Sequence, residues 1–348
     1  MKSKKSLNFS LDKFIDFSLY SKKFGYYMKK NPFGKRGDFI TAPNISRLFA
    51  EMIAIWIISF WESLGSPKKF NLIELGAGNG EMMKTLIESF ENFPVFLKSC
   101  NFIIHEKSPL LIREQKKKLK NEKILWISKI DRLKKIPSIF IANEFFDALP
   151  IKQFRKKENV WFEKFVSFKN RDEAFFFEKK TDIKKVENNI GFKISKNQNF
   201  IEYSELCLNY LKKISKIIKK SNGGLLLIDY GYINKNMKNT LQAVSNHKIA
   251  NILKNIGNTD ITHNLNFNLF QNFIKQIGGL SINLATQKKF LLKMGIKERA
   301  ETISKNKDFL EKADIYYRLQ RLIDEKQMGD LFKVMLIKNE NNEFKLGF

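Results

Sequence analysis

Three polar side chains stand close together where an apolar run ends, in the segment IANEFFDALPI at residues 141–151. They are Asn143, Glu144 and Asp147, and Phe145 and Phe146 lie between the two acids. Carboxylates set among aromatic rings can hold a cationic group through charge-assisted hydrogen bonds. A structural alternative is that Asn143 or Asp147 caps the turn after the strand. The segment therefore predicts a cation-binding slot, with capping as the competing interpretation.

A glycine-rich loop, IELGAGNG at residues 73–80, follows an apolar strand and opens a helix. In that arrangement backbone N–H groups and the helix N-terminus face a ligand. The loop departs from the dinucleotide fingerprint G-x-G-x-x-G, because Glu81 stands where the third glycine is required, and it lacks the Lys-Ser/Thr of a P-loop. It matches the E/D-x-G-x-G-x-G pattern of class I S-adenosylmethionine-dependent methyltransferases. The predicted cofactor residues of the loop are Glu74, Gly76, Ala77, Gly78 and Gly80.

A second acid, Glu106, ends the next apolar strand about one βα unit later. A carboxylate at that point can accept hydrogen bonds from both ribose hydroxyls, and Glu74 suits the cationic amino-acid end of the same cofactor. For the adenine contact after the third strand, both Ser128 and Asp131 stay open.

Strand-like and helix-like segments alternate around these residues. The expected strands are apolar runs bounded by glycine or polar clusters, and the segments between them have apolar residues at helical spacing. The expected strands cover residues 70–75, 101–106, 123–128, 138–143, 225–231, 280–287 and 331–339. This alternation predicts an α/β fold with a doubly wound parallel sheet. Residues 9–30 are expected to be a helix followed by a turn at Gly25, and 232–278 to be irregular before a short helix.

Four consecutive segments describe the expected organisation. They are N-terminal helices with a lid loop (1–65), the first half of the cofactor domain (66–150), an antiparallel β insertion (151–200), and the second half (201–348) with a helical insertion at about 288–328. The insertion at 151–200 is expected because Phe and charged residues alternate between turn signals there.

The composition excludes several classes of protein. Cys100 and Cys207 are too few for a disulfide framework, and three histidines make a metal cluster improbable. No apolar run reaches the roughly 18 residues of a membrane span, and no secretory signal opens the chain. The net charge of +27 is spread along the chain rather than gathered in one basic arm, so nucleic-acid binding is not expected.

Several stretches taken together resemble the MidA-like methyltransferases, relatives of the mitochondrial assembly factor that methylates an arginine of a respiratory complex I core subunit. The stretches run in order along nearly the whole chain: GYY, GKRGDFITAPNISRLFAE, LIELGAGNGEMM, HEKSPLLIREQ, ANEFFDALPI, LLIDYGY, THNLNF, TQKKFLLKMGI and MGDLFKVM. The resemblance implies a Rossmann-like methyltransferase fold with a mainly parallel seven-stranded sheet, S-adenosylmethionine as cofactor, and a protein arginine as substrate.

The resemblance also implies roles for single residues. Glu144 and Asp147 are expected to clamp the substrate guanidinium, with Asn143 orienting one of them and Phe145 or Phe146 walling the slot. The GDFITAP loop is expected to close over the cofactor, unless it only packs the N-terminal helices; its contact residues would be Gly37, Asp38 and Thr41.

Other positions carry open alternatives. His263 and Asp260 match the family; His263 could relay a proton, or bond its own loop. Asp229 is either a substrate-side group or a strand-end acid, and His105 and His247 are interpreted as structural. The chain departs from the family's usual residues at Asn44, Arg47, Ala50, Ile256 and Asn266, which puts substrate-side contacts in question.

Three functions compete at this point. The first is a protein arginine methyltransferase for a complex I core subunit, which assists the assembly of the complex. The second is an RNA methyltransferase, and the third is a non-catalytic assembly chaperone that retains the cofactor. The expected setting is the cytoplasm of a bacterium or, in a eukaryote, the mitochondrial matrix. A homodimer, the arginine modified and the number of methyl groups stay open.

Overall fold

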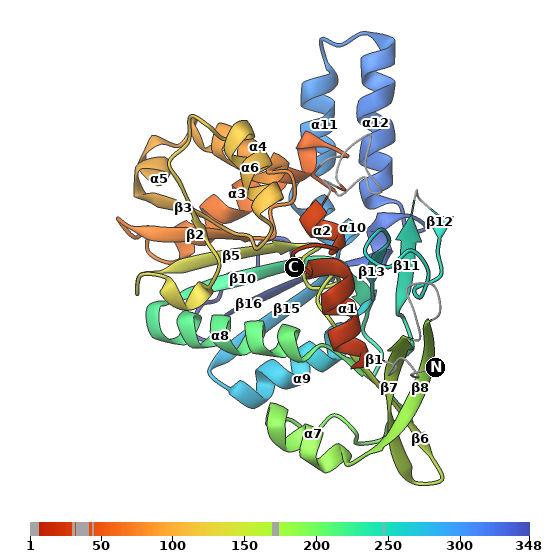
Figure 1. Cartoon of the computed structure of the whole chain (residues 1–348). Coiled ribbons are helices and arrows are strands. Elements are labelled where there is room, and N and C mark those ends of the chain that lie inside the picture. Colours follow the sequence, from red (N-terminus) through yellow and green to blue (C-terminus); the bar gives the residue numbers. More distant parts are fainter. Residues whose placement is uncertain (1–6, 30–31, 33–41, 44, 169–173, 246–247) are drawn as a thin grey trace. The chain divides into compact units, whose positions relative to one another are not determined.

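The computed structural model describes the chain except residues 1–6, 30–31, 33–41, 44, 169–173 and 246–247 (Figure 1). The described residues form two compact units, each built from segments distant in sequence. Unit 1 comprises Met1–Pro32, Phe146–Lys212 and Tyr232–Gln276; unit 2 comprises Phe33–Phe145, Lys213–Gly231 and Ile277–Phe348. The segment boundaries expected from the sequence cut across these units.

The sheet of unit 2 confirms the doubly wound, mainly parallel fold, with seven strands in its main path. Its strand order is β15-β16-β10-β5-β2-β3-β4. The strands are β2 (Phe70–Leu75), β3 (Cys100–His105), β4 (Ile124–Ile127), β5 (Ser138–Asn143), β10 (Gly223–Tyr232), β15 (Leu280–Thr286) and β16 (Phe332–Asn339). All neighbours pair in parallel except β16, which is antiparallel to β10 and β15. The chain winds outward from β2 in one direction and from β5 in the other, so the switch point lies between these two strands, where open α/β sheets bind their ligands.

The central strands β2 and β5 are apolar runs because helices cover them. Every residue of β2 and β5 is buried, as expected for parallel strands with both faces packed. Figure 1 shows α3 and α4 over one face of this sheet. Their core contacts come from large side chains such as Trp56, Phe60 and Phe90. The helices on this stretch are α3 (Arg47–Ser63), α4 (Glu81–Phe90), α5 (Pro94–Ser99), α6 (Pro109–Lys118) and the short 3-10 helix η1 (Ile130–Arg132).

The helical insertion expected near residues 288–328 is present in unit 2. It consists of α10 (Gln287–Lys293), α11 (Ile296–Ser304), α12 (Phe309–Ile323) and α13 (Met328–Leu331). Asp308 caps α12 by accepting a hydrogen bond from the backbone N–H of Glu311 at 2.8 Å. Buried Leu319, Leu322 and Ile323 fix the base of α12 to the core.

Unit 1 contains the expected antiparallel insertion, in a sheet of order β1-β7-β6-β9 with β8 paired to β7. Its strands are β1 (Leu7–Ser10), β6 (Lys152–Lys157), β7 (Val160–Phe168), β8 (Ala174–Thr181) and β9 (Phe200–Tyr203). The helices are α1 (Leu11–Tyr20), α2 (Tyr26–Lys29), α7 (Ile183–Ile190) and α9 (Phe267–Ile277), while α8 (Glu205–Ser221) runs on into the unit 2 segment.

Two expectations for these segments are wrong. The first helix begins at Leu11 rather than at residue 9, because residues 7–10 pair as β1 with residues 165–168 of β7. Residues 232–278 are not irregular throughout, since they form β11 (Gln242–Ser245), β12 (Lys248–Ile249), β13 (Asp260–Thr262) and the two-residue β14 (Leu265–Asn266). For β1, pairing with a distant strand decides the conformation, which local spacing does not reveal. The short strands β11, β12 and β13 pair with one another.

Gly223 begins β10 in a backbone conformation that a side chain could hardly adopt. Its φ is +125°, and a Cβ there would lie 1.9 Å from the carbonyl oxygen of Ser138 on β5. We expect Gly223→Ala to lower the free energy of unfolding by about 3 kcal/mol or more, since strain and a backbone clash add. Gly65→Ala is the matched control, because its φ is +83° but nothing lies within 4 Å; it should cost only about 1 kcal/mol. Urea unfolding compares the two, and equal losses would contradict the steric argument.

Candidate functional site

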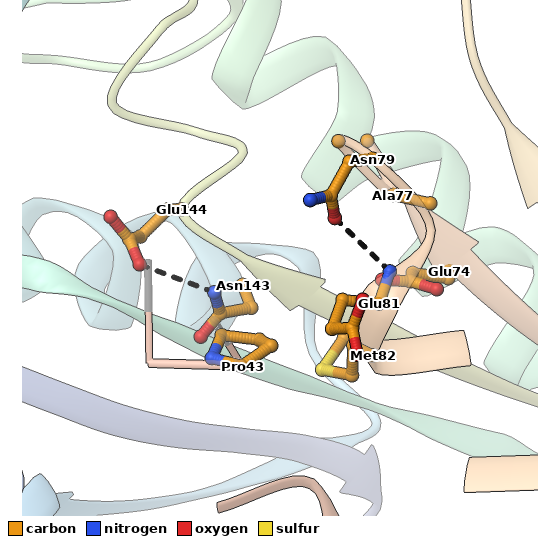
Figure 2. Close-up of a pocket in the computed structure, with 10 residues that line it drawn as sticks. Pro43, Glu74, Ala77, Asn79, Glu81, Met82, Asn143 and Glu144 are labelled. Atoms are coloured by element: carbon orange, nitrogen blue, oxygen red, sulfur yellow. Dashed lines mark hydrogen bonds between the residues drawn. The ribbon is translucent and has the colours of Figure 1, made fainter. Parts of the chain in front are cut away.

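A pocket opens at the carboxyl ends of β2 and β5. Figure 2 shows the residues that line it, which come from the glycine loop, the start of α4, the end of β5 and, for Pro43, the segment before α3. They are Pro43, Glu74, Gly76, Ala77, Gly78, Asn79, Glu81, Met82, Asn143 and Glu144. The described lining includes three carboxylates and no basic side chain, and Lys118 of α6 pairs with one of them, Glu81. The switch point of the sheet therefore carries a pocket whose described lining is acidic rather than basic.

The glycine loop has a backbone conformation that residues with a Cβ rarely adopt. Gly76, Gly78 and Gly80 all have positive φ values, of +68°, +52° and +79°. A Cβ on Gly76 would lie 2.7 Å from the Phe145 ring. Gly80 is the N-cap residue of α4, so the N–H groups of the first helical turn lie next to the loop, and the N–H of Glu81 donates to Asn79 Oδ1 at 3.2 Å. The glycine spacing in the sequence thus corresponds to a loop of left-handed backbone, of which Gly76 and Gly78 line the pocket.

Glu74 is a buried carboxyl at the end of β2. Burial, and secondly the negative charge of Glu106, raise the pKa of Glu74 to about 8. Its Oε2 has no hydrogen-bond partner among the described residues. A buried acceptor without a partner costs free energy, and a bound cation or N–H donor would relieve that cost.

Glu106 and the glycine loop are joined by a residue that the sequence did not single out. Gln115 of α6 is fully buried and donates from Nε2 to the carbonyl of Gly78 at 2.9 Å and to Glu106 Oε2 at 3.3 Å. Its Oε1 accepts from Trp126 Nε1 at 2.9 Å. Glu106 also accepts from the backbone N–H groups of residues 107 and 108 at 2.8 and 2.9 Å, and burial raises its pKa. The carboxylate is therefore held in place beside the loop.

Glu144 has a left-handed backbone, with φ of +48°. Such a conformation is uncommon for residues other than glycine, and strain of this kind gathers at functional sites. Its N–H extends the ladder to Ile228 at 3.0 Å, while Oε1 accepts from Asn143 Nδ2 at 3.3 Å and from the N–H of Ala42 at 3.4 Å. The Oδ1 atom of Asn143 is buried and has no partner among the described residues. Figure 2 shows both side chains at the pocket.

Asp147 and His263 belong to unit 1 and are not among the residues that line this pocket. Asp147 is buried, and its carbonyl oxygen accepts from the N–H of His263 at 3.3 Å. Burial lowers the pKa of His263 to about 4, so its imidazole is neutral at pH 7. Nearby, Tyr27 donates its hydroxyl to Asp260 at 2.8 Å. The structure thus groups His263 with Asp147, and Asn143 with Glu144.

The two phenylalanines between Glu144 and Asp147 also have different surroundings. Phe145 lies over Gly76 beside the pocket. Phe146 is a core residue of unit 1 and meets Tyr210 and Phe270 edge-on, at ring centroid distances of 6.3 and 6.0 Å. Phe145 is therefore the one that lies beside the glycine loop.

The remaining predicted residues have mixed surroundings. Asp229 is fully buried and accepts from the N–H of Tyr230 at 2.9 Å. Ser128 and Asp131 are both exposed after β4, and Asp131 pairs with Lys213 at 2.7 Å. Gly37, Asp38, Thr41, Asn44 and His247 lie outside the described residues.

Two departures from the family pattern have local explanations. Arg47 forms ion pairs with Glu51 and Glu88 on the surface of unit 2, at 3.0 and 2.9 Å. Asn266 caps α9 by accepting from the N–H of Leu269 at 3.1 Å, a role that asparagine fills as well as aspartate does. Both residues therefore take part in structural contacts.

Within the described ranges we find no helix with the length and hydropathy of a membrane-spanning segment. In the same part of the chain, no three His, Cys, Asp or Glu side chains gather as a metal site would need.

Comparison with known proteins identifies the family of the chain. A family model for S-adenosyl-L-methionine-dependent methyltransferases matches residues 52–286. The chain belongs to this family. It is therefore a methyltransferase, and S-adenosylmethionine is its cofactor.

Curated relatives extend the match beyond the family model. The mitochondrial protein arginine methyltransferase NDUFAF7 of Xenopus tropicalis is 28% identical over 89% of this chain and 77% of its own length. The human protein of the same name is 27% identical, over 88% and 75%. A solved Burkholderia thailandensis protein bound to S-adenosyl-homocysteine superposes with a TM-score of 0.82 at 21% identity, covering 98% of this chain and 90% of that one. This last likeness confirms the methyltransferase fold.

The residues of the pocket fit the cofactor of the family. Glu74 offers a buried acceptor without a partner, which suits the amino group of S-adenosylmethionine. The glycine loop leaves room where any side chain would collide with Phe145, and the immobilised Glu106 suits a pair of ribose hydroxyls. These assignments remain proposals for single residues, whereas the cofactor itself follows from the family.

Proposed function

We propose that this methyltransferase modifies arginine side chains of a protein. One observation carries the proposal: at the pocket, the buried Asn143 Oδ1 atom has no partner among the described residues, and the Glu144 carboxylate lies beside it. A guanidinium has five N–H donors and no acceptor, so it complements two acceptor groups placed side by side. The names of the curated relatives support the same substrate class.

The proposed division of labour follows from the charges. S-adenosylmethionine supplies an electrophilic methyl group on its sulfonium. Glu144 binds two N–H groups of the guanidinium and draws its positive charge toward them, which leaves the third nitrogen more nucleophilic. Asn143 orients the Glu144 carboxylate through the 3.3 Å hydrogen bond. Most of the rate enhancement would therefore come from positioning and electrostatics.

We further propose that Asp147 is the second carboxylate of the slot, and that Gly37, Asp38 and Thr41 close over the cofactor. His263 enters the proposal as an uncharged group that forms hydrogen bonds, because its lowered pKa makes it a weak base. For the substrate we propose a core subunit of respiratory complex I, in keeping with the family resemblance. The relatives are mitochondrial; the matching settings for this chain are the matrix or a bacterial cytoplasm.

The test is transfer of a radiolabelled methyl group from S-adenosylmethionine into extract of host cells that lack this gene. Label that protease removes and RNase leaves, and that amino-acid analysis recovers as methylarginine, is the expected result. Label lost only with RNase would favour an RNA methyltransferase. Absence of label together with intact S-adenosyl-homocysteine binding, by calorimetry, would favour a non-catalytic assembly chaperone.

A further inference from the structure

Gln115 of α6 lies where four parts of unit 2 meet. Its side chain is fully buried, and its amide joins α6 to the glycine loop, to the residue after β3 and to the edge strand β4. Nε2 donates to the Gly78 carbonyl at 2.9 Å and to Glu106 Oε2 at 3.3 Å, while Oε1 accepts from Trp126 Nε1 at 2.9 Å. Both N–H groups of the amide are therefore used within the protein, and neither is left to contact a ligand.

The three partners of the Gln115 amide determine which way it faces. An indole N–H can only donate, whereas a backbone carbonyl and an ionised carboxylate can only accept. If the amide turned over, its Oε1 would face two acceptors and its Nε2 would face the Trp126 donor. The amide is therefore fixed in the orientation that directs its N–H groups at Gly78 and Glu106.

The two carboxylate oxygens of Glu106 differ in their hydrogen bonds. Oε1 accepts from the backbone N–H groups of Lys107 and Ser108, at 2.8 and 2.9 Å. Of the described hydrogen bonds of Glu106, Oε2 takes part in one, with Gln115. Burial raises the pKa of Glu106, and the bond from Gln115 opposes that rise. Oε2 is therefore the oxygen with more acceptor capacity left for a ligand hydroxyl, and Gln115 helps to keep it ionised.

Gln115 also ties Glu106 to the wall of the cofactor pocket. Glu106 is not among the residues that line the pocket, whereas Gly78 is. The amide of Gln115 bonds to both, and its Cγ atom lies 3.4 Å from the point where a Cβ on Gly80 would stand. A ligand group is bound well only if its partners are held in the productive geometry before it arrives. The contacts of Gln115 hold the Glu106 carboxylate in a fixed position relative to the glycine loop.

We propose that Gln115 is a positioning residue for the cofactor: it holds Glu106 Oε2 beside the Gly78 segment, where this oxygen accepts a hydrogen bond from a ribose hydroxyl of S-adenosylmethionine. Trp126 supports it by keeping the amide in its orientation. Through this arrangement Gln115 gives the pocket its preference for a complete ribose over a deoxyribose. The inference concerns the cofactor alone and does not depend on which group accepts the methyl.

The test compares Gln115→Met with Gln287→Met in the full chain. Methionine keeps the length of the side chain and removes the amide. Gln287 of α10 is the matched control, because it is also a fully buried glutamine of unit 2 and donates from Nε2 to the carbonyl of Leu322 at 2.9 Å, but it does not line the pocket. Calorimetry measures the affinity of each protein for S-adenosyl-homocysteine and for its 2′-deoxy and 3′-deoxy analogues, each of which lacks one ribose hydroxyl.

We expect Gln115→Met to bind S-adenosyl-homocysteine about tenfold more weakly than wild type, as for the loss of a hydrogen bond to a charged group. Its preference for the complete ribose over the weaker-binding deoxy analogue should fall to about twofold or less, because the two changes remove one shared interaction. Gln287→Met should keep the affinity and the preference of wild type, although both variants should melt at lower temperature. Equal weakening by both variants, or an undiminished ribose preference in Gln115→Met, would overturn the proposal, as would a wild-type protein without that preference.

Trp126→Phe is a second variant, which decides the matter if Gln115→Met does not fold. It leaves Gln115 in place, keeps an aromatic ring on β4 and removes the indole donor that orients the amide. We expect it to lower the affinity for S-adenosyl-homocysteine about threefold, the effect of one hydrogen bond between uncharged groups, and to reduce the ribose preference in the same direction. A ribose preference identical to that of wild type would overturn the proposal. None of these measurements needs a methyl acceptor, so they stand apart from the test of arginine methylation.

Discussion

Replacing Glu144 by glutamine is expected to lower the rate of methyl transfer by about 100- to 1000-fold, the usual cost of one preorganised electrostatic contact. Glutamine keeps the size of the side chain and experiences the same left-handed φ of +48°, so the fold should be retained. It loses the negative charge that is proposed to hold the guanidinium. Labelled methyl transfer measures the rate, and calorimetry with S-adenosyl-homocysteine should show unchanged affinity.

The control for this variant is Glu88→Gln on α4. Glu88 is also a carboxylate of unit 2, but it pairs with Arg47 on the surface and does not line the pocket. Its loss should change the rate less than twofold, since exposed ion pairs contribute about 0–1 kcal/mol. Wild-type turnover in Glu144→Gln would remove this residue from the mechanism.

Cofactor binding is expected to depend on pH through Glu74. Because its pKa is raised to about 8 by burial and by Glu106, Glu74 is protonated in the free protein at pH 7. The cationic amino group of S-adenosylmethionine favours the ionised form, so binding should release up to about one proton. Affinity should therefore rise as pH increases from 6 toward 8 and level off above it.

Stability of the free protein should follow the opposite trend. A carboxyl whose folded-state pKa lies above its unfolded value of 4.5 binds more protons when folded. Its contribution to stability is complete below that unfolded value and is lost as the pH rises through about 8. The free protein should thus melt at a lower temperature at pH 9 than at pH 6, with bound cofactor reducing the difference.

Glu74→Gln separates this effect from the general pH response of the chain. The variant should bind S-adenosylmethionine about tenfold or more weakly above pH 8, and its affinity should change little with pH. Calorimetry at one pH in two buffers of different ionisation enthalpy counts the protons released. Equal proton release by wild type and Glu74→Gln would show that another group releases the proton when the cofactor binds. The first candidate would be Glu106, because burial also raises its pKa.

The strands and the glycine loop of the pocket could be predicted because each is encoded by a short stretch of sequence. β2 and β5 are unbroken apolar runs, and the glycines of residues 76–80 require a backbone that few other residues adopt. Gln115 escaped notice for the opposite reason. It carries no charge and belongs to no motif, and its two bonds to Gly78 and Glu106 exist only because α6 folds beside the loop.

The acids of the opening segment show a second limit. Glu144 and Asp147 are three residues apart, so spacing alone groups them as one clamp. In the structure the chain passes from unit 2 into unit 1 after Phe145, and the two carboxyls have different neighbours. The strand β1 was missed in a similar way, because its partner β7 lies about 160 residues later in the chain.

The position of β16 has a consequence for synthesis on the ribosome. This strand, residues 332–339, is hydrogen-bonded to β10 on one side and to β15 on the other, so it enters the sheet between two strands made before it. Until those residues emerge, the nascent chain exposes the unpaired edge of β10, which is a template for pairing with other chains. Stalled or truncated products that end before residue 332 should therefore aggregate or recruit chaperones, even though they contain every residue of the described pocket.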